Sequence, residues 1–131
     1  MVLLGIIGRI LFGGYFLMSG IRHFMNADML SGYAASKGVP APRAAVYGSG
    51  ALLVIGGLGV LSGMYVAWAV AALALFFVPV SFMMHAFWSV EPSQRMGESV
   101  NFLKNMALLG AALMLLAIPE PWAYALSYFL Q

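Results

Sequence analysis

The chain contains no cysteine, and this absence excludes several kinds of chemistry at once. A protein without thiols forms no disulfide, offers no thiolate nucleophile and supplies no thiolate ligands for an iron–sulfur cluster. It also lacks the CxxC pair that thiol redox enzymes use. If this protein takes part in redox chemistry, the electrons are carried by something other than its own side chains.

Charged residues are scarce as well. Only 8% of the 131 residues are Asp, Glu, Lys or Arg, against roughly 25% in soluble domains, and 63% are apolar. The six basic residues form no patch interleaved with aromatic side chains, as binding of single-stranded nucleic acid requires. The composition therefore excludes nucleic acid as a partner and is typical of an integral membrane protein.

Four apolar runs are long enough to cross a bilayer, whose ~30 Å hydrocarbon core needs about 20 helical residues. They cover about residues 2–21, 44–61, 66–87 and 100–118. These runs predict an all-α fold, a transmembrane four-helix bundle that occupies residues 1–131 as a single domain in contact with the lipid bilayer. The first run carries Arg9 and has no basic segment before it, so we expect a retained span rather than a cleaved signal.

The segments between the runs suggest how the chain is oriented. Residues 22–43 leave room for a short interfacial helix, and residues 62–65 predict a tight turn. The last ten residues are rich in Trp, Tyr and Phe but too short to span, so we expect an interfacial tail. Basic residues concentrate in or beside segments 22–43 and 88–99, and the positive-inside rule places both segments in the cytoplasm of a multi-pass inner-membrane protein.

The second apolar run is unusually rich in glycine. Small residues let helix backbones approach closely in lipid, where no hydrophobic force draws helices together. This run should therefore be an interior helix or the contact between two copies of the chain. The residues concerned are Gly48, Gly50, Gly56, Gly57 and Gly59.

Ionisable and amide side chains at the start of the fourth run form one candidate site. Asn101, Lys104 and Asn105 follow the i, i+3, i+4 spacing, which predicts that they project from one helical face. Lys104 lies only about one turn inside the run, within ~6–8 Å of the boundary, so it either snorkels to the surface or takes part in a polar site.

The third run offers a second polar face near the same boundary. Ser81, His85 and Trp88 share helical spacing there. His85 is either a hydrogen-bonded structural group or a partner for a quinone carbonyl and a proton relay, because imidazole titrates near neutral pH. His85 and His23 could in principle ligate haem, but no haem-attachment motif is present, and the spans contain no carboxylate, so we expect no metal site.

Arg9 lies deeper in the first run, near the opposite boundary. Glycines beside it would let a neighbouring backbone approach, so we expect Arg9 to tie the bundle together through carbonyl groups or a lipid phosphate. Ser19 should satisfy polar groups inside the bundle. Arg22 closes the first run at the boundary shared with His85 and Lys104. We expect all three to be structural polar residues.

A series of short motifs resembles the DoxX family of small four-helix membrane proteins, in order and over nearly the whole chain. The last two motifs are the most specific. The motifs are Gly8-Arg9-Ile10-Leu11, Phe16-Leu17-Met18-Ser19-Gly20-Ile21 followed by a basic residue, Gly38-Val39-Pro40, Gly56-Gly57-Leu58, His85-Ala86-Phe87-Trp88, and Asn101-Phe102-Leu103-Lys104-Asn105-Met106-Ala107-Leu108-Leu109-Gly110.

The resemblance implies a bacterial or archaeal protein associated with quinone-linked redox systems, such as a small subunit of a quinol oxidase or of a thiosulfate:quinone oxidoreductase. It implies that Arg9, His85, Lys104 and Asn105 are the family's recurrent polar residues. The chain departs from the family where many relatives carry a glutamate shortly before the paired glycines. Apolar residues 52–54 occupy that stretch here, so no carboxylate pairs with Arg9 or Lys104 from this position.

The sequence thus favours an accessory subunit of a membrane redox system, not catalytic alone, that binds a quinone as its cofactor or, in place of a cofactor, a lipid-like molecule. Its site would comprise His85, Lys104, Asn105, Asn101 and Trp88, and a redox partner subunit or a second copy of the chain would bind it. The alternative is a structural or assembly protein that packs through its glycine-rich second helix without ligand chemistry. A transporter fits poorly, because the spans lack carboxylates and broken helices.

Overall fold

The computed structural model describes residues 1–130, and that part of the chain is helical without any strand. Four long helices are apolar enough to cross a membrane: α1 (Val2–Met25), α3 (Pro42–Ser62), α4 (Val66–Met84) and α5 (Pro92–Met114). The short helix α2 (Ala27–Ser36) joins α1 to α3. The all-α four-helix bundle is confirmed, as is a short helix between the first two spans.

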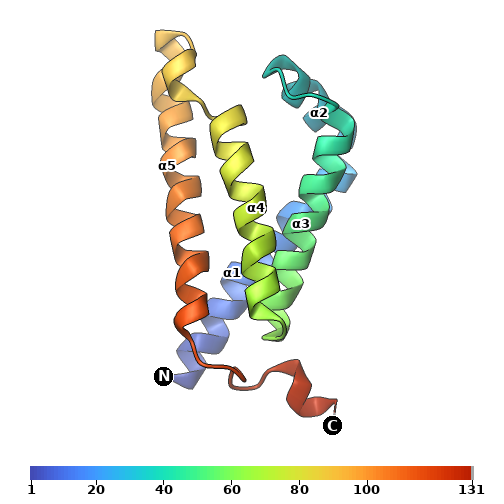
Figure 1. The fold of residues 1–131 in the computed structure, drawn as a ribbon, viewed down its shortest axis with the longest axis vertical. Helices are drawn as coiled ribbons and strands as arrows, with labels where there is room; N and C mark the ends of the chain where they lie inside the picture. Colours follow the sequence, from blue (N-terminus) through green and yellow to red (C-terminus); the bar gives the residue numbers. More distant parts are fainter. Residues whose placement is uncertain (131) are drawn as a thin grey trace.

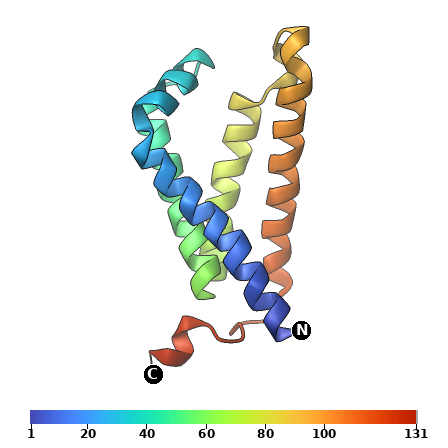
Figure 2. The same cartoon turned by 180° about the vertical axis from the view of Figure 1, so that it is seen from behind.

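The helices pack in the order α1, α3, α4, α5, each against the next. α1 crosses α3 diagonally and packs along it, while α5 packs against α4 (Figures 1 and 2). Both termini lie at the end of the bundle that carries the α3–α4 turn, which we call the terminal end. The opposite end, called the α2 end, carries α2 and the connection from α4 to α5, including the 3₁₀ turn η1 (Phe87–Ser89).

Glycine allows α1 and α3 to touch backbone to backbone. A Cβ atom added at Gly57 would lie 2.5 Å from the backbone nitrogen of Leu17 and 2.8 Å from the carbonyl oxygen of Gly13. Gly56, on the neighbouring face of α3, meets the side chain of Leu73 from α4. The glycine-rich helix is therefore an interior helix, and Gly56 is not available to a second copy of the chain. Gly48 alone among the five glycines of that run faces open space.

Aromatic and aliphatic side chains fill the space between α1, α3 and α4. Phe16 of α1 meets Phe77 of α4 edge to face, with ring centroids 5.5 Å apart. Leu53, Val60 and Leu73 are almost completely buried beside them. Burial of this kind gives no hydrophobic gain against lipid, so close packing and the glycine contacts hold the bundle together.

Two helices extend beyond the apolar runs. α1 continues to Met25 rather than ending near residue 21, and α5 begins at Pro92 rather than near residue 100. Hydropathy detects only the part of a helix that crosses hydrocarbon, whereas helix boundaries follow caps and breakers. Asn26 ends α1, and Pro92 occupies the first turn of α5, where a missing N–H is tolerated. The extension of α5 places Glu98 on a helix.

The C-terminal segment folds back across the terminal end of the bundle (Figure 1). It follows the 3₁₀ turn η2 (Leu115–Ala117) and contains a second one, η3 (Leu126–Phe129). Trp122 is only 4% exposed and Ala125 is fully buried against the core. The tail thus packs on the helices, while Tyr128 and Phe129 stay exposed as an interfacial position requires.

Candidate functional site

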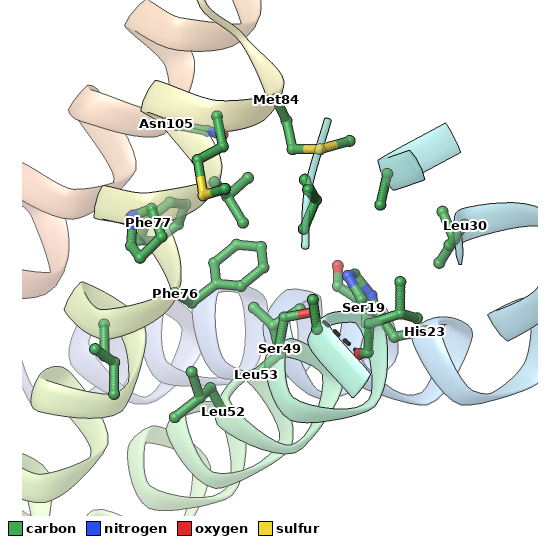
Figure 3. A pocket seen from close by; sticks show the side chains of 18 of the residues that line it. Ser19, His23, Leu30, Ser49, Leu52, Leu53, Phe76, Phe77, Met84 and Asn105 are labelled. Atoms are coloured by element: carbon green, nitrogen blue, oxygen red, sulfur yellow. Dashed lines mark hydrogen bonds between the residues drawn. The ribbon is translucent and has the colours of Figure 1, made fainter. Parts of the chain in front are cut away.

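A cavity of about 420 Å³ lies among the helices toward the α2 end. We call it the central cavity, and Figure 3 shows it from close by. All five α-helices contribute to its wall, which is mostly apolar. Its apolar residues include Phe16, Leu30, Leu52, Leu53, Phe76, Phe77, Met83 and Met84, and its polar residues are Tyr15, Ser19, His23, Tyr33, Ser49, His85 and Asn105.

Asn105 is the polar residue with the clearest capacity to bind a ligand. It lies on α5, is 7% exposed and lines the central cavity (Figure 3). Its amide makes no hydrogen bond to any other group among residues 1–130, although the neighbouring Lys104 and Asn101 bond to each other. Its polar atoms are not among the fully buried ones that lack a partner, so they stay accessible from the cavity. Asn105 therefore offers two N–H donors and one carbonyl acceptor to whatever enters the cavity.

Two further polar groups of the cavity are already oriented by their own helices. The imidazole Nδ1 of His23 lies 2.8 Å from the carbonyl oxygen of Ser19, and the hydroxyl of Ser49 donates to the carbonyl of Val46 at 3.0 Å. Since a carbonyl only accepts, Nδ1 of His23 carries the hydrogen. In the neutral ring, Nε2 of His23 is then an acceptor. From the sequence, His23 was considered only as a haem ligand with His85, and Ser49 was missed.

Glu98 joins three segments at the α2 end. Its Oε1 accepts from the ammonium of Lys37 at 2.7 Å, and its Oε2 lies 2.7 Å from Nδ1 of His85. The three side chains are only 12–18% exposed. Lys37 follows α2 and His85 ends α4, so Glu98 connects α5 to the segment after α2 and to the end of α4. The hydrogen bond to Glu98 raises the pKa of Lys37 above its ordinary value and keeps the ammonium charged.

We call Lys37, Glu98 and His85 the ionic network. Sequence reasoning missed it, because Glu98 lies before the apolar part of α5 and Lys37 lies 61 residues away along the chain. The spacing of thirteen residues between His85 and Glu98 gives no signal either. The ionic network contains one carboxylate and one imidazole, which is fewer than the three ligands that a metal site needs. No group of three or more His, Asp or Glu side chains that could hold a metal ion is found anywhere in residues 1–130.

A second, polar pocket of about 770 Å³ adjoins the central cavity at the α2 end. The two share Tyr33, Met83 and Met84 as wall residues. Lys37 and Glu98 line the polar pocket, whereas His85 lines the central cavity. The ionic network therefore stands between an apolar chamber within the bundle and a polar one at its end.

Lys104 does not join this site. It is exposed, and its ammonium donates to the amide oxygen of Asn101 at 3.3 Å. Asn105 points inward and Asn101 lines the polar pocket, so these three residues do not share one environment. Consecutive helical residues are about 100° apart, which turns Lys104 outward when Asn105 faces the cavity. The expectation of a single polar face on α5 is wrong in this respect.

Trp88 is likewise outside the cavity. α4 ends at Met84, and the following 3₁₀ turn redirects the chain, so Ser81, His85 and Trp88 do not continue one helical face. Trp88 is exposed and packs on the rings of Phe82, Phe87 and Phe102. Ser81 is fully buried, and its hydroxyl has no partner among the described residues.

The polar residues of α1 occupy three different settings. Arg9 donates to the carbonyl of Leu61 at 2.7 Å and to that of Ala123 at 2.8 Å, so it links α1 to the end of α3 and to the tail. Ser19 lines the central cavity, whereas Arg22 is exposed at the α2 end of α1. Arg9 and the central cavity thus lie toward opposite ends of the bundle.

Comparison with known proteins gives one match. The family model DoxX matches residues 4–86, from the start of α1 to just beyond α4. The matched part contains Arg9 and His85 but neither Glu98 nor Asn105, so the motif that opens the fourth span lies outside it. No curated protein and no solved structure matches the chain.

Proposed function

We propose that this chain, which belongs to the DoxX family, binds a quinone in its central cavity and serves as an accessory subunit of a membrane redox system. The observation that carries this proposal is the mostly apolar chamber of about 420 Å³ with the unpartnered amide of Asn105 in its wall. Small-molecule sites are typically apolar chambers of roughly 300–1,000 Å³ with a few placed polar groups. A quinone, with an apolar tail and two carbonyl oxygens, suits such a chamber.

The polar groups of the cavity suit both redox forms of such a ligand. The amide N–H of Asn105 can donate to a carbonyl oxygen, and Nε2 of His23 can accept from a hydroxyl group when the ring is neutral. The apolar wall, including Leu52 and Leu53 in place of the glutamate of many relatives, would hold the tail and exclude water. A bound quinone supplies the two-electron chemistry that the side chains of this protein lack.

The ionic network supports a path for protons. Quinone reduction consumes protons, and His85 lines the central cavity while its Nδ1 is bonded to Glu98 in the polar pocket. The carboxylate of Glu98 holds the imidazole of His85 by its Nδ1–H, which leaves Nε2 as the ring nitrogen that would exchange a proton with the cavity. Lys37 holds that carboxylate in place from the other side.

The electrons for the quinone would come from a redox partner protein, which is consistent with the absence of cysteine from the chain. We place that redox partner on the α2 end, beside the ionic network and the polar pocket. The positive-inside rule puts this end, residues 22–43 and 88–99, in the cytoplasm.

The first test is the replacement Asn105→Leu, which removes the amide donors from the cavity and keeps a side chain of similar size. We expect the affinity for a short-chain benzoquinone to fall by roughly 3- to 10-fold, because a neutral hydrogen bond contributes ~0.5–1.5 kcal/mol. Equilibrium dialysis of the detergent-purified protein measures this. Lys104→Leu is the matched control: it lies next to Asn105 on α5 but faces outward, so its affinity should equal that of the parent protein.

Two results would contradict the proposal. One is the absence of saturable quinone binding by the parent protein. The other is an affinity that changes equally in Asn105→Leu and Lys104→Leu, since the ligand would then not distinguish the cavity from the outer face of α5.

A further inference from the structure

A separate groove lies between α1 and α5 at the terminal end. It has a volume of about 480 Å³ and shares no wall residue with the central cavity. It exists because α1 packs on α3 and α5 packs on α4, which leaves the facing sides of α1 and α5 apart. Gly5, Gly8 and Arg9 line it from α1, Ala111 from α5, and Trp122 from the tail.

Arg9 brings an uncompensated positive charge to this groove. Among residues 1–130, no carboxylate lies within ion-pair distance of its guanidinium; the ion pairs found there are Lys37–Glu98, His85–Glu98 and Arg43–Asp28. Two of its N–H groups donate to backbone carbonyls, which satisfy hydrogen bonds but carry no net charge. A cation at a lipid-facing groove, without a counter-ion among the described residues, favours an anion.

Two further donors beside the groove lack acceptors. The Nε of Arg9 and the indole Nε1 of Trp122 are buried and make no hydrogen bond within the described part of the chain. Both atoms are shielded from solvent, so a ligand in the groove would reach Arg9 through the remaining N–H groups of its two terminal nitrogens. Phosphate and ester oxygens are acceptors, and an arginine fork matches the geometry of a phosphate group.

The depth of Arg9 fits a headgroup. Its two carbonyl partners belong to the end of α3 and to the tail, so the guanidinium points toward the terminal end of the bundle, where the helices leave the apolar layer. The rest of the groove wall is apolar and includes Leu115 and Ile118. A Cβ atom at Gly5 or Gly8 would meet nothing within 4 Å, so the glycines leave room for an acyl chain.

The geometry points to an anionic phospholipid as the occupant of this groove, with its phosphate at Arg9 and an acyl chain along Gly5 and Gly8. The lipid joins α1, α5 and the tail on a side where they have few contacts of their own. This site is independent of the proposed quinone cavity at the other end.

The experiment is native mass spectrometry of the delipidated full chain titrated with phosphatidylglycerol and, separately, with zwitterionic phosphatidylcholine. We expect one phosphatidylglycerol to be retained about tenfold more tightly than phosphatidylcholine, because the choline ammonium of the latter offsets the negative charge of its phosphate. Gly8→Leu fills the groove without touching the bonds of Arg9 and should abolish this preference. Gly14→Leu is the control, because Gly14 also faces open space but lines none of the three pockets described above.

Three other outcomes of this titration would count against the proposed lipid site. Equal retention of the two lipids would overturn the role of the charge, and an unchanged preference in Gly8→Leu would overturn the location. Displacement of the lipid by inorganic phosphate alone would show that the groove takes a free anion rather than a lipid. Thermal melting of each variant by circular dichroism verifies that the bundle is folded in every sample compared.

Discussion

Replacing Gly57 by alanine is expected to destabilise the bundle by about 2–3 kcal/mol, at the upper part of the range for an overpacked core. The added methyl group would lie 2.5 Å from the backbone nitrogen of Leu17 and 2.8 Å from the carbonyl oxygen of Gly13. Both are backbone atoms, which cannot rotate away as a flexible side chain does. α1 must therefore move off α3, and the close contact that binds the two helices in lipid is lost.

Gly48→Ala is the matched control for this prediction. Gly48 lies on the same helix, and a Cβ atom there meets nothing within 4 Å. Alanine is the better helix former, by up to ~1 kcal/mol in water, so this variant should be as stable as the parent or slightly more so. Unfolding in detergent with rising dodecyl sulfate, followed by circular dichroism, measures both. Equal stability of Gly57→Ala and Gly48→Ala would show that α1 and α3 do not pack as described.

The glycines also show how far the sequence predicts this fold. Five glycines within one apolar segment indicate an interior helix, and the four spans follow from hydropathy alone. The pattern does not say which glycine faces which neighbour. Gly57 faces α1 and Gly56 faces α4, one residue apart, because α3 lies between the two helices. That assignment depends on crossing geometry, which a sequence without aligned relatives does not contain.

The candidate site was predictable only in part. His85 and Asn105 line one cavity, as helical spacing and depth suggested, but Lys104 and Trp88 lie outside it. The depth of a residue in a helix follows from counting, whereas its orientation depends on where the helix begins, ends and turns. The role of Glu98 was not predicted, because its partners come from segments that only the fold brings together.

Removing the charge of Glu98 is the second change with a large expected effect. Glu98→Gln leaves the ammonium of Lys37 and the imidazole of His85 without their shared carboxylate, although both remain largely buried. Loss of one partner from a buried ion pair costs about 3–5 kcal/mol. The network lies at the end of the bundle, where water can reach it in part, so we expect about 2 kcal/mol.

The loss should be local, because the ionic network is what ties the segment after α2 to α5. Hydrogen exchange followed by mass spectrometry should show faster exchange in residues 27–41 of Glu98→Gln, with α1 and α3 unchanged where they pack. Glu91→Gln is the control: Glu91 precedes the same helix, is exposed and forms no ion pair within residues 1–130. Uniformly faster exchange in both variants would contradict a local tie.

A double-mutant cycle separates the ion pair from the carboxylate itself. Once Lys37 is replaced by methionine, Glu98→Gln should cost less stability, because no buried ammonium is left without a counter-charge.

The pH dependence of the stability that this ion pair contributes has a defined sign. Since Glu98 raises the pKa of Lys37, the stabilisation by this pair is complete below the pKa of an unfolded lysine and declines as the pH rises through the higher value of the folded state. Lys37→Met should therefore abolish that alkaline decline.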